Sequence, residues 1–227
     1  MKKIVSEQDV NNNFDTVVST LRAYFNSMEC PNYDSIKLTN EYFNWIIQKT
    51  KLILNENNFK IPYSAIPNTI TQATYNWLRP DKKIIVDKYY VMNIATAKYT
   101  INVKKNVILD EDIFIIMRSI VLTRKAVVWV DFGYNIGCEF GGRHPAIILK
   151  NLKDSLIVIP LSSQQPANLD YNVQIDIVYG FEKMIRWANI TRITQVSLSR
   201  LYFNQFGDVK PCVLTDISNK FSISGII

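Results

Sequence analysis

The stretch CEFGGRHPAIIL, residues 138–149, contains the only histidine of the 227-residue chain, His144. Imidazole is the side chain whose ordinary pKa lies closest to neutrality, so it can take up or release a proton during catalysis. The same residue could instead fill a position in a β-strand, because the apolar run after Pro145 is typical of one. Its position before a proline in a glycine-rich loop favours a functional site over the core. Arg143, which precedes it, is either a solvated charge or a phosphate contact.

Cysteine chemistry and metal binding find no support in the spacing of the possible ligands. Cys30, Cys138 and Cys212 are odd in number and form no CxxC pair, so we expect reduced thiols, no zinc site and no cofactor. Reduced thiols indicate a cytoplasmic protein, and acidic residues follow MKKIV where the apolar core of a signal peptide would run. The most apolar stretch, residues 112–122, is too short for a membrane span and contains an arginine.

The charge of the chain permits an anionic partner. The formal net charge is +6, with 15 basic and 12 acidic residues in 1–120 and 11 basic and 8 acidic residues in 121–227. The excess is +3 on each side, so neither part is a basic tail. A solvated surface of mixed charge accounts for most of the lysines.

Glycine marks a change of character along the chain. All 7 glycines lie at or beyond Gly133. Glycine accepts the positive φ that tight turns between strands often require. Its absence predicts a helical segment with open loops, and its later appearance predicts a compact barrel or sandwich. We therefore expect a mainly α-helical N-terminal region, residues 1–120, of unknown role, followed by a β domain, residues 121–227.

Two amphipathic helices are predicted to begin the chain and to pair as a hairpin. Apolar residues recur at steps of three and four from Val10 to Met28, and a second helical stripe runs through Ile36, Phe43, Ile47 and Leu54 at steps of four and seven. Three further elements are expected in this region: a short helix over 71–78, a strand pair over 82–94 and 98–109, and a helix over 110–122. The hairpin could dimerise, recruit a partner or lie over the C-terminal domain, and the sequence leaves these roles open.

The C-terminal part is predicted to be mostly β-structure. AVVWVDF, PAIILKN, SLIVIPLSS and NVQIDIV are short apolar or alternating runs separated by turn residues. Pro211 is placed to open a short amphipathic helix that continues to Phe221. The sequence therefore predicts an α+β protein with a small C-terminal β-barrel and a terminal helix.

These C-terminal runs also resemble the successive signature blocks of the MazF/PemK toxin family. VVWVDFGYNIGCEFGGRHPAIILKN, LIVIPLSSQ, IRWANITRIT and SRL follow in the family's order and at plausible spacing, within residues 121–227. The resemblance implies an SH3-like barrel that forms a homodimer and cleaves single-stranded RNA without a metal, through attack of the ribose 2′-hydroxyl. It also implies a cognate antitoxin, and operator DNA as a partner of the toxin–antitoxin complex.

Matching this chain to the family motifs gives the candidate catalytic residues. His144 stands where many members place a catalytic arginine, and it would act as acid or base. Arg143 is no simple substitute, because neighbouring residues of a strand point to opposite faces. Ser162 matches a family threonine and would donate its hydroxyl. Arg186 matches an arginine of the PemK branch that would clamp the phosphate, and its apolar neighbours suggest that it faces away from the core.

The remaining matches concern RNA contact and one departure from the family. Arg143, Glu139 and Gln164 are the candidate RNA-binding residues, and Ala188 stands where an aspartate is expected. Two hypotheses therefore remain open: a metal-independent toxin-like endoribonuclease, or a catalytically degenerate barrel that binds nucleic acid or a protein partner. Convergence of the three catalytic candidates on one groove would favour the enzyme, and scattering would favour the degenerate barrel.

Overall fold

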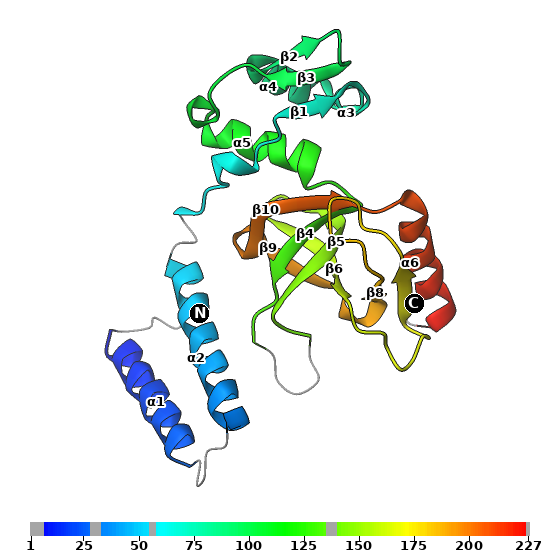
Figure 1. Ribbon diagram of the computed structural model, residues 1–227. Helices are drawn as coiled ribbons and strands as arrows, with labels where there is room; N and C mark the ends of the chain where they lie inside the picture. Colours follow the sequence, from blue (N-terminus) through cyan, green and yellow to red (C-terminus); the bar gives the residue numbers. More distant parts are fainter. Residues whose placement is uncertain (1–6, 28–32, 55–57, 135–139, 226–227) are drawn as a thin grey trace, which may run out of the picture. The chain divides into compact units, whose positions relative to one another are not determined.

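The computed structural model describes residues 7–27, 33–54, 58–134 and 140–225 (Figure 1). Contacts divide the chain into two compact units, Met1–Lys51 and Leu52–Ile227. Helices and antiparallel sheets are mixed, as predicted for an α+β protein. Among the described residues, no helix combines the length and apolarity needed to cross a membrane.

The first unit consists of the two predicted helices. α1 (Glu7–Asn26) and α2 (Tyr33–Leu54), which runs slightly past the unit boundary, confirm the expected elements. Their apolar side chains line a groove of about 560 Å³ that Leu21, Phe25 and Phe43 help to form. Phe25 remains more than half exposed, because two helices alone provide too little surface to bury a wide apolar stripe.

The second unit begins with a small α/β segment around a three-stranded antiparallel sheet of order β1-β3-β2. Its elements are β1 (Thr69–Thr71), α3 (Gln72–Trp77), α4 (Pro80–Tyr89), β2 (Tyr90–Asn93), β3 (Lys98–Ile101) and α5 (Asp110–Ile116), with short 3₁₀ turns at Tyr63–Ala65 and Lys105–Val107. α5 continues into a π-helical turn, Met117–Val121, that leads into the next sheet. A core that includes Ile66, Ile70 and Ile113 holds the segment together.

The predicted strand over residues 82–94 is wrong for most of its length, because α4 occupies it. Pro80 is the first helical residue and Asp81 lies in the first turn, which are both helix-start signals. Val86 is buried and Tyr89 is half-buried, three residues apart on one helix face. Only Tyr90–Asn93 forms the predicted pairing, with Lys98–Ile101.

Seven antiparallel strands and one helix complete the second unit. They are β4 (Ala126–Asp131), β5 (Arg143–Asn151), β6 (Ser155–Ser162), β7 (Asn172–Ile175), β8 (Arg186–Asn189), β9 (Thr194–Ser197), β10 (Leu201–Asp208) and α6 (Pro211–Ser224), with 3₁₀ turns at Ile190–Arg192 and Leu198–Arg200. The strands pair in the order β10-β4-β5-β6-β8-β7, and β9 pairs with β6.

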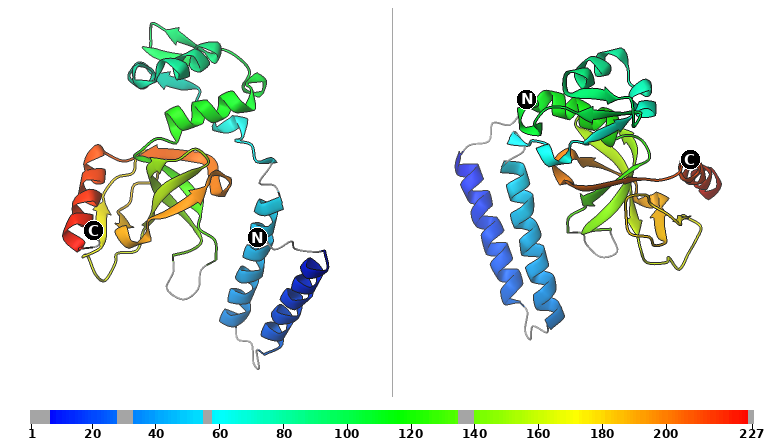
Figure 2. Two further views of the ribbon diagram at one scale, coloured as in Figure 1. Left: turned by 180° about the vertical axis from the view of Figure 1, so that it is seen from behind. Right: turned by 45° about the horizontal axis from the view of Figure 1, so that its top comes forward.

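The central strands of this sheet are buried on both faces. On β5, Ala146 and Ile148 point into one core, and Ile147 points into a second core that Ile217 of α6 also joins. α6 packs beside β7 in this second core (Figure 2). Because side chains alternate along a strand, burial on both sides produces continuous apolar runs such as PAIIL.

A close backbone approach joins the two ends of the strand order. An isolated bridge connects Tyr179, which follows β7, to Asp208 of β10 through backbone hydrogen bonds of 2.9 and 3.1 Å. A Cβ at Gly207 would lie 2.1 Å from the Tyr179 carbonyl oxygen, and a Cβ at Gly180 would lie 2.6 Å from the Phe206 carbonyl oxygen. No longer ladder joins these ends in the described part of the chain, so the bridge depends on the two glycines.

We expect Gly207→Ala to lower the free energy of unfolding by about 3 kcal/mol, because backbone must move to admit the methyl group. Gly142→Ala is the matched control, since its Cβ would meet no atom within 4 Å and only its φ of +77° is unfavourable. That control should cost about 1 kcal/mol. Urea denaturation followed by tryptophan fluorescence measures both, and equal losses would contradict the role of the close approach.

Candidate active site

The start of β5 sends Arg143 and His144 to opposite faces of the sheet. The Arg143 guanidinium lies over the Tyr202 ring, 3.9 Å from its centroid, and 5.1 Å from the centroid of Trp129. The His144 ring instead contacts Phe140, with centroids 4.2 Å apart. The predicted separation of these two neighbours is therefore confirmed.

His144 and Ser162 lie on the same face. β5 and β6 pair with Ala146 opposite Pro160, so continuing the register by two residues places His144 opposite Ser162. Directly opposed residues of an antiparallel pair project to the same side. Phe140 supports this placement, because it contacts His144 and lines the same small cavity of about 140 Å³ as Ser162.

A tight turn holds the hydroxyl of Ser162 at the end of β6. Its Oγ accepts a hydrogen bond from the Gln164 backbone N–H at 3.1 Å. Gln164 is exposed and lines the cavity together with Trp187 and Asn189. The turn therefore presents one hydroxyl and one amide side chain to the same space.

The surroundings of His144 favour its neutral form. Burial lowers the pKa of His144, while backbone hydrogen bonds with Leu161 and Gly141 act in the opposite direction and the positive charge of Arg192 lowers the pKa further. The balance is a pKa below the ordinary value of 6.5. A neutral imidazole can accept a proton at pH 7.

Arg192 places a further cation on this face, and the motifs of the sequence did not point to it. Its guanidinium lies 4.9 Å from the Phe140 ring centroid. It ends a 3₁₀ turn that Asn189 caps by accepting a hydrogen bond from the Thr191 backbone N–H at 2.9 Å. It also lines a neighbouring groove of about 600 Å³, which contains Arg200. IRWANITRIT contains two arginines, and motif matching selects only the first.

Arg186 has a different place from the one expected. It is 5% exposed, so the expectation that it faces away from the core is wrong. One guanidinium nitrogen, Nη1, donates to the backbone carbonyls of Glu182 at 3.0 Å and Met184 at 3.3 Å. Ser162 pairs with Trp187, so the adjacent Arg186 points to the opposite face. Burial lowers the pKa of Arg186, and Glu182 partly offsets this.

The structure therefore brings two of the three catalytic candidates together. His144 and Ser162 share one face, and Gln164 lies beside them. Arg186 and Arg143 lie on the other face, where the Phe181 ring contacts both Trp129 and the Arg186 guanidinium. The sixth candidate residue, Glu139, lies outside the described residues. Throughout the described ranges, His, Cys, Asp and Glu side chains form no group of three that could hold a metal ion.

Residues 123–224 match the family model described as "PemK-like, MazF-like toxin of type II toxin-antitoxin system". This part of the chain is a PemK/MazF toxin domain. The resemblance predicted from the sequence blocks is thereby confirmed, and every described residue of the candidate site lies within the toxin domain.

Solved structures similar to the chain include two that concern MazF proteins. The Mycobacterium tuberculosis toxin MazF-mt6 is 11% identical, covers 44% of this chain and 96% of its own, and has a TM-score of 0.35. A chain from the MazE–MazF crystal structure of Deinococcus radiodurans is 20% identical, covers 46% of this chain and 96% of its own, and also has a TM-score of 0.35. A comparison with curated proteins finds no match.

We expect Arg186→Met to lower the free energy of unfolding by about 2 kcal/mol, because two carbonyl groups lose their donor. Limited proteolysis should also cut more readily near residues 182–184. Arg143→Met is the matched control, since Arg143 is exposed and its replacement should change stability by less than about 0.5 kcal/mol. Urea denaturation measures both variants. An unchanged stability of Arg186→Met would exclude a structural role for this guanidinium.

Proposed function

We propose that the toxin domain is a metal-independent endoribonuclease that cleaves single-stranded RNA by attack of the ribose 2′-hydroxyl. The observation that carries this proposal is the shared face of His144 and Ser162 beside the guanidinium of Arg192. The family description as a toxin of a type II toxin–antitoxin system supports it. We also propose that the sheet has an SH3-like arrangement, in which the isolated Tyr179–Asp208 bridge links the two ends of the strand order.

The chemistry divides among three side chains. Neutral His144 takes the proton of the 2′-hydroxyl, so that the oxygen attacks the adjacent phosphorus and the bond to the 5′-oxygen breaks. The Ser162 hydroxyl donates a hydrogen bond to a phosphate oxygen, and Arg192 stabilises the negative charge that develops on the phosphorane. The departing 5′-oxygen takes up a proton from water, leaving a cyclic phosphate and a 5′-hydroxyl.

The same face offers contacts for the RNA chain. Phe140 provides an aromatic ring against which an unpaired base can stack, and Gln164 and Asn189 provide amide groups for base edges. The groove with Arg200 can follow the phosphate backbone. Gln164 thus keeps the RNA-contact role expected from the sequence.

The arginines of the opposite face have other proposed roles. Arg186 acts as a positioning residue for the loop before β8, because its hydrogen bonds end on loop carbonyls. Arg143 lies over the Tyr202 ring on the opposite face, so it can contact RNA only if the RNA chain continues past the start of β5. Neither arginine lies at the position of His144, where many family members place a catalytic arginine. This absence is the observation that favours the alternative, a degenerate barrel that binds without cleaving.

The partners are proposed from the family. A type II toxin has a cognate antitoxin, and one similar solved structure is titled as a MazE–MazF complex. We propose a cytoplasmic homodimer that binds such an antitoxin, with operator DNA as the ligand of the toxin–antitoxin complex. In this proposal residues 121–227 carry the toxin activity and residues 1–120 are an additional region.

We expect the purified 227-residue protein to cleave single-stranded RNA in EDTA, and His144→Ala to lower kcat/KM at least about 100-fold by removing the proton acceptor. Lys153→Ala is the control, because Lys153 is exposed in the turn between β5 and β6, at the ends of these strands away from His144 and Ser162, and its loss should leave cleavage near the wild-type rate. RNA that stays intact with the wild-type protein would overturn the enzyme and leave the degenerate barrel. Cleavage that survives His144→Ala would remove this histidine from the mechanism.

The pH dependence of cleavage should report the neutral form of His144. Since the base must be unprotonated, kcat/KM should rise with pH and reach a plateau, with its inflection below the ordinary pKa of 6.5. Arg192→Gln removes a positive charge that lowers this pKa, so the inflection should move to higher pH while the plateau falls. Profiles measured between about pH 5 and pH 8 test both effects. A profile that Arg192→Gln leaves unshifted would contradict the assignment.

A further inference from the structure

The positive charge of the chain is concentrated in one segment outside the toxin domain. Residues 58–109 contain eight Lys or Arg and two Asp, a net charge of +6 that equals that of the whole chain. The rest of the chain carries 18 basic and 18 acidic residues. A count over residues 1–120 hides this concentration, because it adds the acidic residues of 1–57 and of the start of α5 to those of the segment.

The same segment has the element order of a winged helix-turn-helix. β1 is followed by α3, α4, β2 and β3, and the strands pair in the order β1-β3-β2. Leu78 and Arg79 form the turn between the helices. Thr71 caps α3 by accepting a hydrogen bond from the Thr74 backbone N–H at 3.1 Å. The loop 94–97 between β2 and β3 corresponds to the wing.

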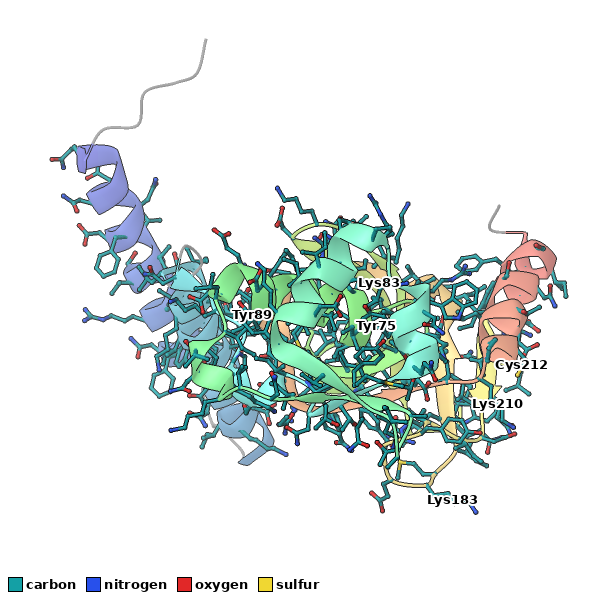
Figure 3. The ribbon with its side chains drawn as sticks, turned by 90° about the horizontal axis from the view of Figure 1, so that it is seen from above. Tyr75, Lys83, Tyr89, Lys183, Lys210 and Cys212 are labelled. Carbon is teal, nitrogen blue, oxygen red and sulfur yellow. The ribbon has the colours of Figure 1, made fainter. Side chains whose placement is uncertain are left out.

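Side-chain contacts fix α4 against α3 and the sheet. The Tyr75 hydroxyl donates to the Asp87 carboxylate, with oxygen distances of 2.8 and 3.0 Å, and the Tyr75 and Tyr99 rings stack 3.9 Å apart. Burial and the Asp87 carboxylate raise the pKa of Tyr75 to about 12, so the hydroxyl remains a donor. The Lys83 ammonium lies 5.2 Å from the Tyr75 ring centroid, and the two residues lie close together near α3 and α4 (Figure 3).

A second set of contacts joins the C-terminal end of α4 to α5. Asp112 of α5 is buried, and it accepts a hydrogen bond from the Tyr89 hydroxyl at 2.6 Å and from Lys88 at 3.4 Å. Val86 is also buried in the segment's core. α4 is therefore packed along one side and leaves its other side exposed.

The exposed parts of α4 and the wing combine cations with apolar side chains. Arg79 has an 82% exposed side chain and lies one helical turn before Lys83, which is partly exposed. Ile84 is 63% exposed on α4, and Ile94 is 90% exposed at the start of the wing loop. Lys98, at the base of the wing, is also exposed. Both acidic residues of the segment are engaged within it, Asp81 by Arg79 and Lys82, and Asp87 by Tyr75.

We propose that residues 58–109 bind duplex DNA, with α4 in the major groove and the loop 94–97 against the neighbouring backbone. In helix-turn-helix proteins the second helix enters the major groove, and its flanking cations contact phosphates. Ile84 occupies the exposed face of α4, where an apolar side chain can contact thymine methyl groups. This binding belongs to the chain itself and does not depend on the proposed RNA cleavage, since the segment precedes residues 123–224.

The charge and topology favour duplex DNA over the two competing ligands. A protein partner would explain the exposed isoleucines but not a segment with four basic residues for each acidic one. Single-stranded RNA is bound mostly through several aromatic stacking platforms, whereas Tyr75 and Tyr99 stack on each other and the 90% exposed Trp77 can stack one base. A rigid exposed helix flanked by cations is suited to a groove of fixed width.

The test is fluorescence anisotropy with the full-length protein in EDTA. The probes are a labelled random-sequence duplex of about 30 base pairs and a 2′-O-methylated single-stranded RNA of about the same length, which lacks the nucleophilic hydroxyl. The double variant Arg79→Gln/Lys83→Gln should weaken duplex binding about 10-fold and reduce the salt slope by about 2, because two phosphate contacts are lost. Lys150→Gln/Lys153→Gln is the control, since it removes the same charge from exposed positions of the toxin domain.

Each outcome decides the proposal. Loss of duplex binding in the α4 variant alone, with unchanged circular dichroism and thermal midpoint, supports it. Equal loss in both variants would show binding by net charge alone and overturn it. Absence of duplex binding at about 50 mM salt, or tighter binding of RNA that depends on the same two cations, would also overturn it. RNA cleavage by the α4 variant should match the wild-type rate in all cases.

Discussion

β5 lies between β4 and β6 and forms backbone hydrogen bonds with both. Its side chains can therefore point only to one face of the sheet or to the other. This constraint decides which side chains of the toxin domain lie together, because Arg143 and His144 are consecutive and must separate. The residue that shares a face with Ser162 is the imidazole, and the guanidinium points to the aromatic side chains of the other face. A shift of one residue in the pairing would exchange the two.

The cation of the site comes from a different strand connection. Arg192 reaches Phe140 from the 3₁₀ turn after β8, and the capped turn limits its freedom. The imidazole, hydroxyl and guanidinium therefore come from three separate segments. Such a constellation depends on the sheet holding all three segments in place, while a loop alone would leave them mobile.

The sequence predicted the parts of the fold that follow from the spacing of apolar residues and from proline and glycine at the ends of elements. The two amphipathic helices, α3 and the four apolar runs that form β4, β5, β6 and β7 were predicted, because apolar spacing records which side is buried, whereas β8, β9 and β10 were not. The strand expected over 82–94 was wrong for residues 82–89, because the β-branched run of Ile84, Ile85 and Val86 favours a strand while Pro80 starts a helix. β1 was not predicted, because three residues are too few to show an alternation of apolar and polar side chains.

The candidate site was predictable only where a motif fixes both residue type and strand position. His144 and Ser162 stand at strand ends that pair with each other, so matching the motif also placed them together. Arg186 matched a motif in type, but its burial depends on carbonyls of a loop whose path no local pattern reveals. Arg192 was missed because its proximity to Phe140 is a contact across more than fifty residues.

The two halves of the second unit share their aromatic cover. Four phenylalanines pack against both the core of the basic segment, residues 58–109, and a core of the toxin domain: Phe59, Phe114, Phe203 and Phe206. Phe59 and Phe203 lie 6.1 Å apart between ring centroids, although they come from opposite ends of this unit. Shared burial couples the unfolding free energies of the two halves, so neither can open without exposing rings that stabilise the other. The basic segment is thus a folding partner of the toxin domain, and slow hydrogen exchange should extend through both as one cooperative block.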